Sequence, residues 1–150
     1  MDAIDRAIIR HLEQNARLSN LELAERVGLS PSPCLRRVRR LESEGIIKGY
    51  HAHIEPSAVE RGFQVMVHVT MAVQDEPTLK AFEQRVAKLE EVSECRRMFG
   101  HPDYLLWIAV ADLETFEKLY VSKLVVLPGV ARTNSQFTMK VVKRARSLRG

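Results

Sequence analysis

The sequence predicts an α+β protein in which a helical part precedes a part where strands and helices alternate. Two patterns carry this prediction. As far as Gly45, apolar residues recur every three or four positions, which is the period of an amphipathic helix. From Phe63 onward, stretches with an apolar residue at every second position, typical of strands, alternate with further helical stretches.

The composition is that of a globular protein. Of the 150 residues, 45% are hydrophobic and 28% are charged, a balance that excludes a disordered chain. The apolar run from Tyr104 to Ala111 is far too short to cross a bilayer, and the N-terminus lacks the apolar core of a secretory signal, so we expect no membrane partner. Cys34 and Cys95 lie far apart, which argues against a disulfide framework or a zinc site and fits a reducing cytoplasm.

Positive charge is concentrated in two places. The net charge is +4 and the isoelectric point is near 9.3. Four arginines and no acid lie between Leu29 and Leu41, and five basic residues and no acid lie between Lys140 and Gly150. Such zones suggest a polyanionic partner, most simply nucleic acid, although two solvated surfaces would have the same composition.

Capping signals mark the first two helices. Ser19 and Glu22 predict a capping box at the start of the second helix, in which each side chain satisfies a backbone N–H near the other. Gly28 is the left-handed residue that commonly stops a helix. The apolar stripe of the first helix consists of Ile4, Ile8, Ile9 and Leu12.

The third helix begins with two prolines. Ser30 is a suitable N-cap, because its hydroxyl can accept a hydrogen bond from a first-turn N–H. Pro31 and Pro33 then fall in the first turn, where the N–H groups have no partner within the helix, so neither proline removes a helical hydrogen bond. A short helix, a tight turn containing glycine and a second helix form the helix-turn-helix pattern.

The third helix is basic on its outer side. In that motif the second helix enters the major groove of double-stranded DNA with its N-terminal end near the bases. A helical wheel places on the core side Cys34, Leu35, Val38 and Leu41. It places on the opposite side Ser32, Arg36, Arg40 and Ser43, with Arg37 and Arg39 on the flanks. The candidate DNA-binding residues are Ser30, Ser32, Pro33, Arg36, Arg37, Arg39 and Arg40.

The segment after the third helix predicts a wing. Ile46 to Ile54 would form short strands around a turn at Lys48 and Gly49, which completes a winged helix-turn-helix domain over residues 1–54. A stretch without clear period follows, so we expect a linker at 55–63.

The second domain, expected at 64–150, has the order β-α-β-β-α-β. Its strands and helices are expected in the ranges 63–73, 77–92, 92–100, 104–111, 112–127 and 130–142. This order predicts a ferredoxin-like sheet with both helices on one side. The other face carries Met66 and Thr70 and would be wetted by Gln64 and His68 if it stayed exposed. An uncovered and fairly apolar sheet face predicts self-association.

Two stretches resemble a known family. The block "LSNLELAERVGLSPSPCLRRVRRLESEGIIKGY" and the loop "GHPDYLL" are similar to the Lrp/AsnC (leucine-responsive, or feast/famine) transcriptional regulators, and the resemblance covers nearly the whole chain. It implies DNA binding by the N-terminal domain and a C-terminal domain of the RAM or ACT type. It also implies a homodimer, often assembled into an octamer, and often an amino-acid effector bound between C-terminal domains. The implied location is cytoplasmic and nucleoid-associated.

The loop from Gly100 to Tyr104 is the candidate effector site. Glycine allows unusual dihedrals, so successive N–H groups could converge on a carboxylate, although the same residue types make ordinary turns. Asp103 could accept the ammonium of an amino acid, and Tyr104 could wall the site. With the resemblance, the candidates are Gly100, His101, Pro102, Asp103 and Tyr104, joined by Thr133, Asn134 and Ser135 from a neighbouring subunit.

Other chemistries have little support. His51 and His53 would share a face of a strand and could bind a metal, but no cysteine or carboxylate completes a set. No Ser-His-Asp or Cys-His arrangement can be built, so we expect neither an enzyme nor a cofactor. The alternatives to an effector-tuned regulator are a nucleoid-type architectural DNA-binding protein without an effector and a small-molecule-binding module whose basic helix is incidental.

Overall fold

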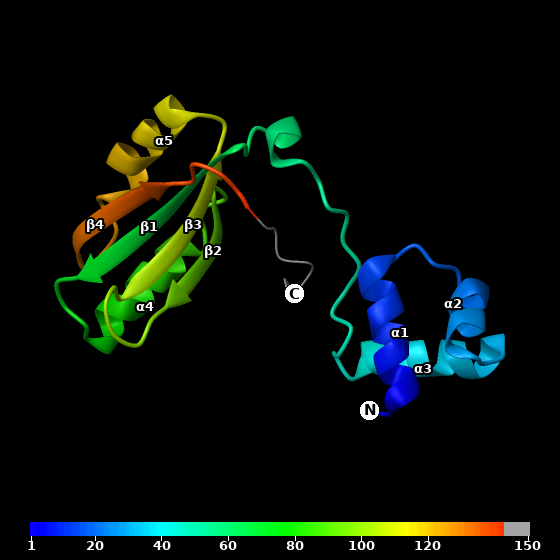
Figure 1. The fold of residues 1–150 in the computed structure, drawn as a ribbon. Coiled ribbons are helices and arrows are strands. Elements are labelled where there is room, and N and C mark those ends of the chain that lie inside the picture. Colours follow the sequence, from blue (N-terminus) through cyan, green and yellow to red (C-terminus); the bar gives the residue numbers. More distant parts are fainter. Residues whose placement is uncertain (143–150) are drawn as a thin grey trace. The chain divides into compact units, whose positions relative to one another are not determined.

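A computed structural model describes residues 1–142 of the chain. The contacts divide it into two compact units, Met1–His53 and Ile54–Val142 (Figure 1). The basic residues that follow Val142 lie outside the described residues, as does the end of the expected second domain. No helix within residues 1–142 is long and apolar enough to cross a membrane.

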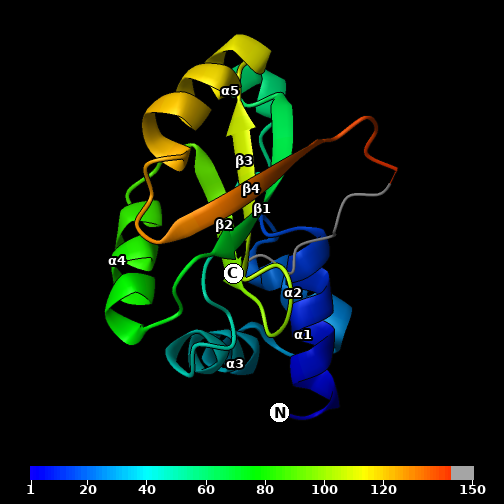
Figure 2. The same cartoon turned by 90° about the vertical axis from the view of Figure 1, so that its left-hand side faces the viewer.

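The first unit consists of three helices, α1 (Ala3–Gln14), α2 (Asn20–Val27) and α3 (Pro31–Ser43) (Figure 2). The expected capping box of α2 is confirmed, because the Ser19 N–H donates to the Glu22 carboxylate over 2.8 Å and the Glu22 N–H donates back to the Ser19 hydroxyl. Gly28 ends α2 in the left-handed conformation, with φ of 70°. The buried core of this unit consists of Ile8, Leu23, Ala24, Cys34 and Leu41.

Helix α3 begins at Pro31, as its sequence predicts. Both prolines of the first turn are accommodated in the helix. Ser30 has the extended backbone of an N-cap, but its side chain makes no capping hydrogen bond. The Asn20 side-chain amide instead donates to the Pro31 carbonyl over 2.8 Å, which ties the starts of α2 and α3 together.

The prediction of wing strands is wrong. Among the described residues, no strand precedes Phe63. The N–H groups of Ile46 and Ile47 both donate to the Leu41 carbonyl, so the chain winds around the end of α3 instead of extending. A lone two-stranded hairpin is marginally stable, and no third strand lies among residues 1–53. The Tyr50 hydroxyl donates to the Glu42 carboxylate over 2.8 Å, which holds the segment against the last turn of α3.

The second unit contains a four-stranded antiparallel sheet with the strand order β2-β3-β1-β4. Its strands are β1 (Phe63–Met71), β2 (Val92–Arg97), β3 (Tyr104–Val110) and β4 (Val130–Phe137). Its helices are α4 (Glu76–Val86) and α5 (Leu113–Leu119), with a π-helical turn η2 (Tyr120–Leu124) after α5 and a short 3-10 turn η1 (Pro56–Val59) before the sheet. The βαββαβ order is confirmed.

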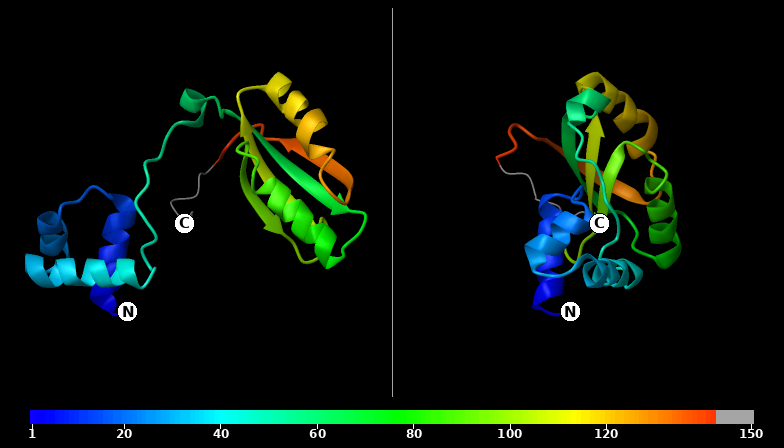
Figure 3. Two further views of the ribbon diagram at one scale, coloured as in Figure 1. Left: turned by 180° about the vertical axis from the view of Figure 1, so that it is seen from behind. Right: turned by 90° about the vertical axis from the view of Figure 1, so that its right-hand side faces the viewer.

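Both helices cover the same face of the sheet (Figure 3). Alternate residues of β1 and β3 are buried against them, as a period of two predicts. No helix of the second unit covers the opposite face within the described residues, and we call it the uncovered sheet face. Its central residues Met66, Leu105 and Trp107 are half-buried, and the Arg96 guanidinium lies 5.1 Å from the centre of the Trp107 ring.

All four strands end earlier than expected, β2 at Arg97 and β3 at Val110. β1 ends at Met71, and Val73 is exposed beyond it. The Met71 N–H donates to the Asp103 carboxylate, and the Ala72 N–H donates to the Gly129 carbonyl. At this end of the sheet, acceptors in loops therefore bind the N–H groups that a longer strand would use in the ladder. β4 ends at Phe137, and Met139 is fully exposed after it.

Candidate functional sites

The exposed side of α3 differs from the helical-wheel prediction, most clearly at Leu35. Cys34 and Leu41 are buried and Val38 packs against the same core, as expected. Leu35 was expected on the core side, but it is 37% exposed and lies outside the core cluster. We use the name exposed stripe of α3 for the residues Ser32, Leu35, Arg36, Arg39 and Ser43.

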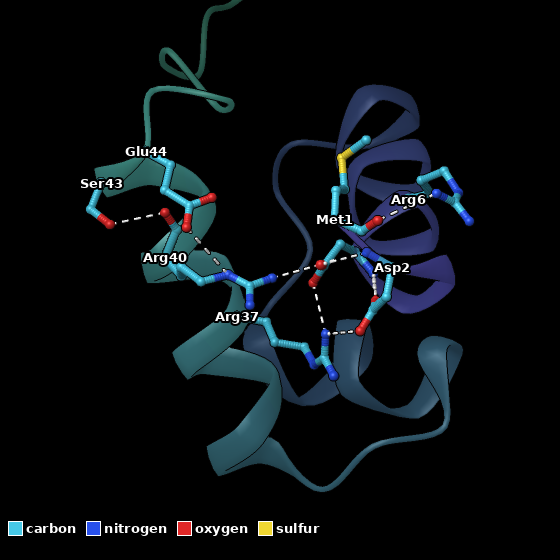
Figure 4. A network of polar contacts seen from close by, with 8 residues as sticks. Met1, Asp2, Arg6, Arg37, Arg40, Ser43 and Glu44 are labelled. Atoms are coloured by element: carbon cyan, nitrogen blue, oxygen red, sulfur yellow. Dashed lines mark hydrogen bonds and ion pairs between the residues drawn. The ribbon is translucent and has the colours of Figure 1, made fainter.

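Two of the four arginines of α3 are tied to the start of α1. The Arg37 Nη1 donates to Asp2 Oδ2 over 2.7 Å and to Asp5 Oδ1 over 2.9 Å. The Arg40 Nη2 donates to Asp5 Oδ2 over 2.6 Å. Figure 4 shows both guanidinium groups pointing from α3 toward the first residues of α1, where Asp2 lies. Arg40 therefore leans toward α1 instead of pointing directly away from the core.

The two acids also cap α1. The Asp2 side chain accepts from the Asp5 N–H, and the Asp5 side chain accepts from the Asp2 N–H. Asp5 is only 1% exposed. The hydrogen bond from the Asp2 backbone is the largest influence on it, and with Arg37 and Arg40 it lowers the pKa of Asp5 to about 2 against the opposing effect of burial. Asp5 is therefore a buried carboxylate that stays charged and fully satisfied.

Sequence reasoning missed this pair of acids, although a signal was present. Asp2 and Asp5 have the spacing of a capping box and precede the first apolar stripe. Their arginine partners lie 32 to 35 residues further along the chain and on another helix, where local periodicity cannot reach.

The other two arginines of α3 are free. Within residues 1–142, neither Arg36 nor Arg39 makes a hydrogen bond or an ion pair, and both are exposed. Ser30, Ser32 and Pro33 lie at the N-terminal end of the same helix. The structure thus separates the candidate arginines into two held by acids and two available to a partner.

A second candidate site lies on the uncovered sheet face beside the loop that joins β2 to β3. It is a shallow pocket of about 300 Å³, lined by His68, Thr70, His101, Pro102, Arg132, Thr133 and Asn134. Four of the sequence-predicted effector residues, two from the loop and two from β4, therefore meet within one chain, whereas the β4 residues were expected to come from a neighbouring subunit.

Asp103 is used inside the protein. Its Oδ2 accepts from the Met71 N–H and its Oδ1 accepts from the Gln74 side-chain amide, each over 2.7 Å. Its backbone N–H also donates to the Val69 carbonyl over 3.0 Å. These bonds pin the loop to the end of β1, and they occupy the carboxylate that was expected to accept an ammonium group.

Tyr104 and Ser135 lie on the other side of the sheet. Tyr104 is 1% exposed, its ring contacts that of Phe82, and its hydroxyl donates to Glu83 over 2.7 Å. Burial and this carboxylate raise the pKa of the Tyr104 hydroxyl. Ser135 is paired with Val67, whose side chain belongs to the helix-covered core. Neither residue lines the pocket, and Gly100, with φ of 108°, shapes the loop without lining the pocket.

The pocket has polar groups without partners. Within residues 1–142 the Arg132 side chain makes no hydrogen bond or ion pair, and His68 Nε2 is buried without a partner. Register explains the grouping, because Thr70 pairs with Arg132 and His68 pairs with Asn134 across β1 and β4. Directly opposed residues of an antiparallel pair share a face, so alternation along the two expected strands was the signal for this pocket.

Known proteins share both units. Residues 1–48 match the family model of a winged helix-turn-helix DNA-binding domain, and residues 64–148 match that of the Lrp/AsnC ligand binding domain. The chain belongs to the Lrp/AsnC family. Among relatives of this Lrp/AsnC protein, the leucine-responsive regulatory proteins of Klebsiella pneumoniae and Escherichia coli K12 are each 42% identical to it over 148 residues, covering 99% of this chain and 90% of theirs.

Solved structures agree over the full length. A transcriptional regulator of Neisseria meningitidis in complex with L-Met has a TM-score of 0.93 and 37% identity, covering 99% of this chain and 96% of that chain. An AsnC family transcriptional regulator from Agrobacterium tumefaciens has a TM-score of 0.92 and 33% identity with the same coverage. This Lrp/AsnC protein is therefore a DNA-binding transcriptional regulator with a ligand-binding domain, and the family resemblance of its sequence is confirmed.

Proposed function

We propose that this Lrp/AsnC protein binds specific DNA sites through α3 and is tuned by an amino acid bound in the pocket beside the β2–β3 loop. The observation that carries the DNA half is the exposed stripe of α3, on which Arg36 and Arg39 have no partner in the described chain. Free arginines on the exposed side of such a helix suit contacts to guanine bases in the major groove.

The paired arginines have a different role in this proposal. Arg37 and Arg40 are each held by acids, yet a guanidinium group has five N–H donors and these bonds leave others unused. A guanidinium that is already oriented loses little side-chain entropy when it meets a phosphate. We assign to Arg37 and Arg40 the positioning of α3 on the DNA backbone, and to Arg36 and Arg39 the base contacts. Ser30, Ser32 and Pro33 remain candidates at the helix start.

The amino-acid half rests on the free polar groups of the pocket. Arg132 is placed to bind the carboxylate of an amino acid, and the unpartnered His68 Nε2 lies in the same wall. The oxygens of Thr70 and Asn134 can accept from the ammonium, while His101 and Pro102 form the loop side. Relatives named for a leucine response and one solved with L-Met support an amino acid as the ligand class.

Assembly belongs to the same proposal. The uncovered sheet face, with Met66, Leu105 and Trp107 half-buried at its centre, suits a homodimer, and dimers of this kind can assemble further to an octamer. A two-fold dimer would bring two copies of α3 to successive major grooves, so the sites should be inverted repeats spaced by whole helical turns.

Selection of binding sites from random DNA by the full-length protein tests the DNA half. Arg36→Ala should weaken binding to the selected site by about 1–3 kcal/mol and relax its sequence preference without changing the melting temperature. Arg17→Ala, which removes an exposed arginine outside α3, is the matched control. Equal binding of wild type to selected and random DNA would instead favour an architectural DNA-binding protein.

A screen of amino acids tests the other half. A ligand that binds only the folded protein raises its melting temperature, and calorimetry then gives the affinity. If no amino acid shifts the melting temperature or alters DNA binding, the effector half of the proposal is wrong and the DNA half stands by itself.

A further inference from the structure

One apolar side chain, Leu35, lies on the exposed stripe of α3. Leu35 is 37% exposed, and it belongs neither to the buried core of the first unit nor to the partly buried residues that pack against that core. Exposed leucines are common, so its exposure alone carries no argument. Its position beside the two free arginines does.

The two margins of this stripe are chemically different. At 100° per residue, Leu35 is about a quarter turn from the buried Cys34, on one margin, while Arg37 and Arg40 lie on the other margin, against α1. The second margin is charged and held by Asp2 and Asp5. Between the two margins, Arg36 and Arg39 present positive charge without any acid among their described contacts.

The charge of the stripe selects the kind of partner that can cover Leu35. A second copy of this stripe would bring free arginines against free arginines, which repel each other. A polyanion is attracted by the same arginines. The floor of the DNA major groove is polar except for one group, the C5-methyl of thymine, which is read by apolar contact.

We propose that Leu35 contacts the C5-methyl group of a thymine in the major groove and so determines part of the sequence that the protein binds. This inference rests on the proposed recognition of DNA by α3 and adds to it an apolar base contact. It assigns the reading of one thymine to Leu35, whereas Arg36 and Arg39 supply charge and polar contacts. Leu35 lies in the N-terminal half of α3, where side chains of a recognition helix reach base edges.

Replacement of thymine by uracil tests the contact, because uracil lacks only this methyl group. Full-length wild type and Leu35→Ala are titrated against a site selected from random DNA by the wild type, with each thymine replaced by uracil in turn. We expect one position per half-site at which the wild type loses about fourfold in affinity, the effect of exposing one methyl group. At that position Leu35→Ala should bind the thymine and uracil sites equally.

Two further variants separate the contact from general effects. Leu35→Met keeps an apolar side chain and should still prefer thymine at that position. Leu21→Ala removes an exposed leucine from α2, outside the stripe, and should keep the full preference of the wild type. The melting temperature and light scattering of each variant report whether fold and assembly are intact.

Several results would overturn the proposal. One is a selected site without thymine. Another is a loss of affinity on uracil replacement that is the same in Leu35→Ala as in the wild type. A third is a Leu35→Ala protein whose oligomeric state changes, which would make Leu35 part of a protein interface. If the wild type selects a site but shows none of the expected coupling, the Leu35 contact alone is wrong. If the wild type selects no site, the proposed function fails together with it.

Discussion

Asp5 is the residue on which the geometry of the first unit depends. It is buried, caps α1, and receives hydrogen bonds from Arg37 and Arg40 of α3. Removing one partner from a buried ion pair leaves the others uncompensated. The position of the exposed stripe of α3 relative to α1 therefore depends on a carboxylate that is itself inaccessible to DNA.

We expect Asp5→Asn to destabilise the protein near neutral pH by about 3 kcal/mol, because it removes the charge that both guanidinium groups face. The folded pKa of about 2 lies below the ordinary value of 3.8, so the charged form is favoured by folding. This stabilisation is fully present above about pH 4 and is lost as the pH falls toward 2. Urea unfolding of both proteins across this range measures the difference.

The same unit supplies a control for that experiment. Asp2 also pairs with Arg37, but its side chain is 53% exposed, so Asp2→Asn should cost much less. If wild type and Asp5→Asn lose stability in parallel between pH 4 and 2, the ion pairs of Asp5 do not contribute in the way proposed.

Single residues show where sequence reasoning reaches its limit. The helical wheel places Cys34, Val38 and Leu41 correctly, because the period of a helix fixes which side is buried. It misplaces Leu35 and does not separate Arg36 from Arg40, since the outcome depends on what the neighbouring helix presents. The period of the sequence predicts on which side of the helix a residue lies. The residue that its side chain contacts depends on how the helices pack together.

At the scale of elements, strand alternation was more reliable than motif likeness. Tyr104 opens the stretch "YLLWIAV", in which Leu106 and Ile108 are buried, so its alternation alone places it in the core. Likeness to the family motif assigned the whole loop "GHPDY", and Tyr104 with it, to the effector site. The predicted strands between Ile46 and Ile54 are absent for a different reason, because two short strands need a third partner and residues 1–53 contain none.

Gly129 shows how a turn between elements is constrained. It adopts φ of 71°, and a Cβ atom there would overlap Thr78 Cγ2 of α4. We expect Gly129→Ala to be destabilised both by its left-handed backbone and by this clash, by about 3 kcal/mol in total. Gly28→Ala is the matched control, because its φ is 70° but nothing lies within 4 Å of the added Cβ, and it should cost about 1 kcal/mol. Equal melting temperatures of the two variants would contradict the clash.

The β2–β3 loop and the pocket beside it give a second pair of contrasting variants. Asp103→Ala should lower the melting temperature of the free protein, because it leaves the Met71 N–H and the Gln74 amide without their acceptor. Arg132→Ala should leave that melting temperature unchanged, because Arg132 makes no ion pair within residues 1–142. It should instead weaken amino-acid binding by about 1.5–3 kcal/mol, the contribution of a charged hydrogen bond.

Calorimetry and thermal unfolding, done on the same two proteins, decide between these roles. Were Arg132→Ala to bind the amino acid as tightly as the wild type, the carboxylate would have to lie elsewhere in the pocket. A stable Asp103→Ala protein that has lost only ligand binding would show instead that Asp103 faces the effector directly.

At the scale of the whole molecule, the uncovered sheet face must be covered by another chain if the proposal of a dimer is correct. Leu105 lies at its centre, paired with His68 on β1 and with Arg96 on β2. Met66 and Trp107 are half-buried on the same face. The apolar area that these side chains expose to water in the monomer would be buried favourably in a dimer. A lysine at Leu105 would place a charge in the middle of that area once a second sheet is packed on it.

We expect Leu105→Lys to shift the protein from dimer or larger assembly to monomer in light scattering, with little change in the fold of either unit. Leu113→Lys places the same charge on an exposed position of α5, on the other side of the sheet, and should leave the assembly intact. The monomer should also bind an inverted-repeat site more weakly, because two linked copies of α3 bind with a high effective concentration that a monomer lacks. An assembly that survives Leu105→Lys but not Leu113→Lys would place the interface on the helices, and the uncovered sheet face would then be free to meet a different partner.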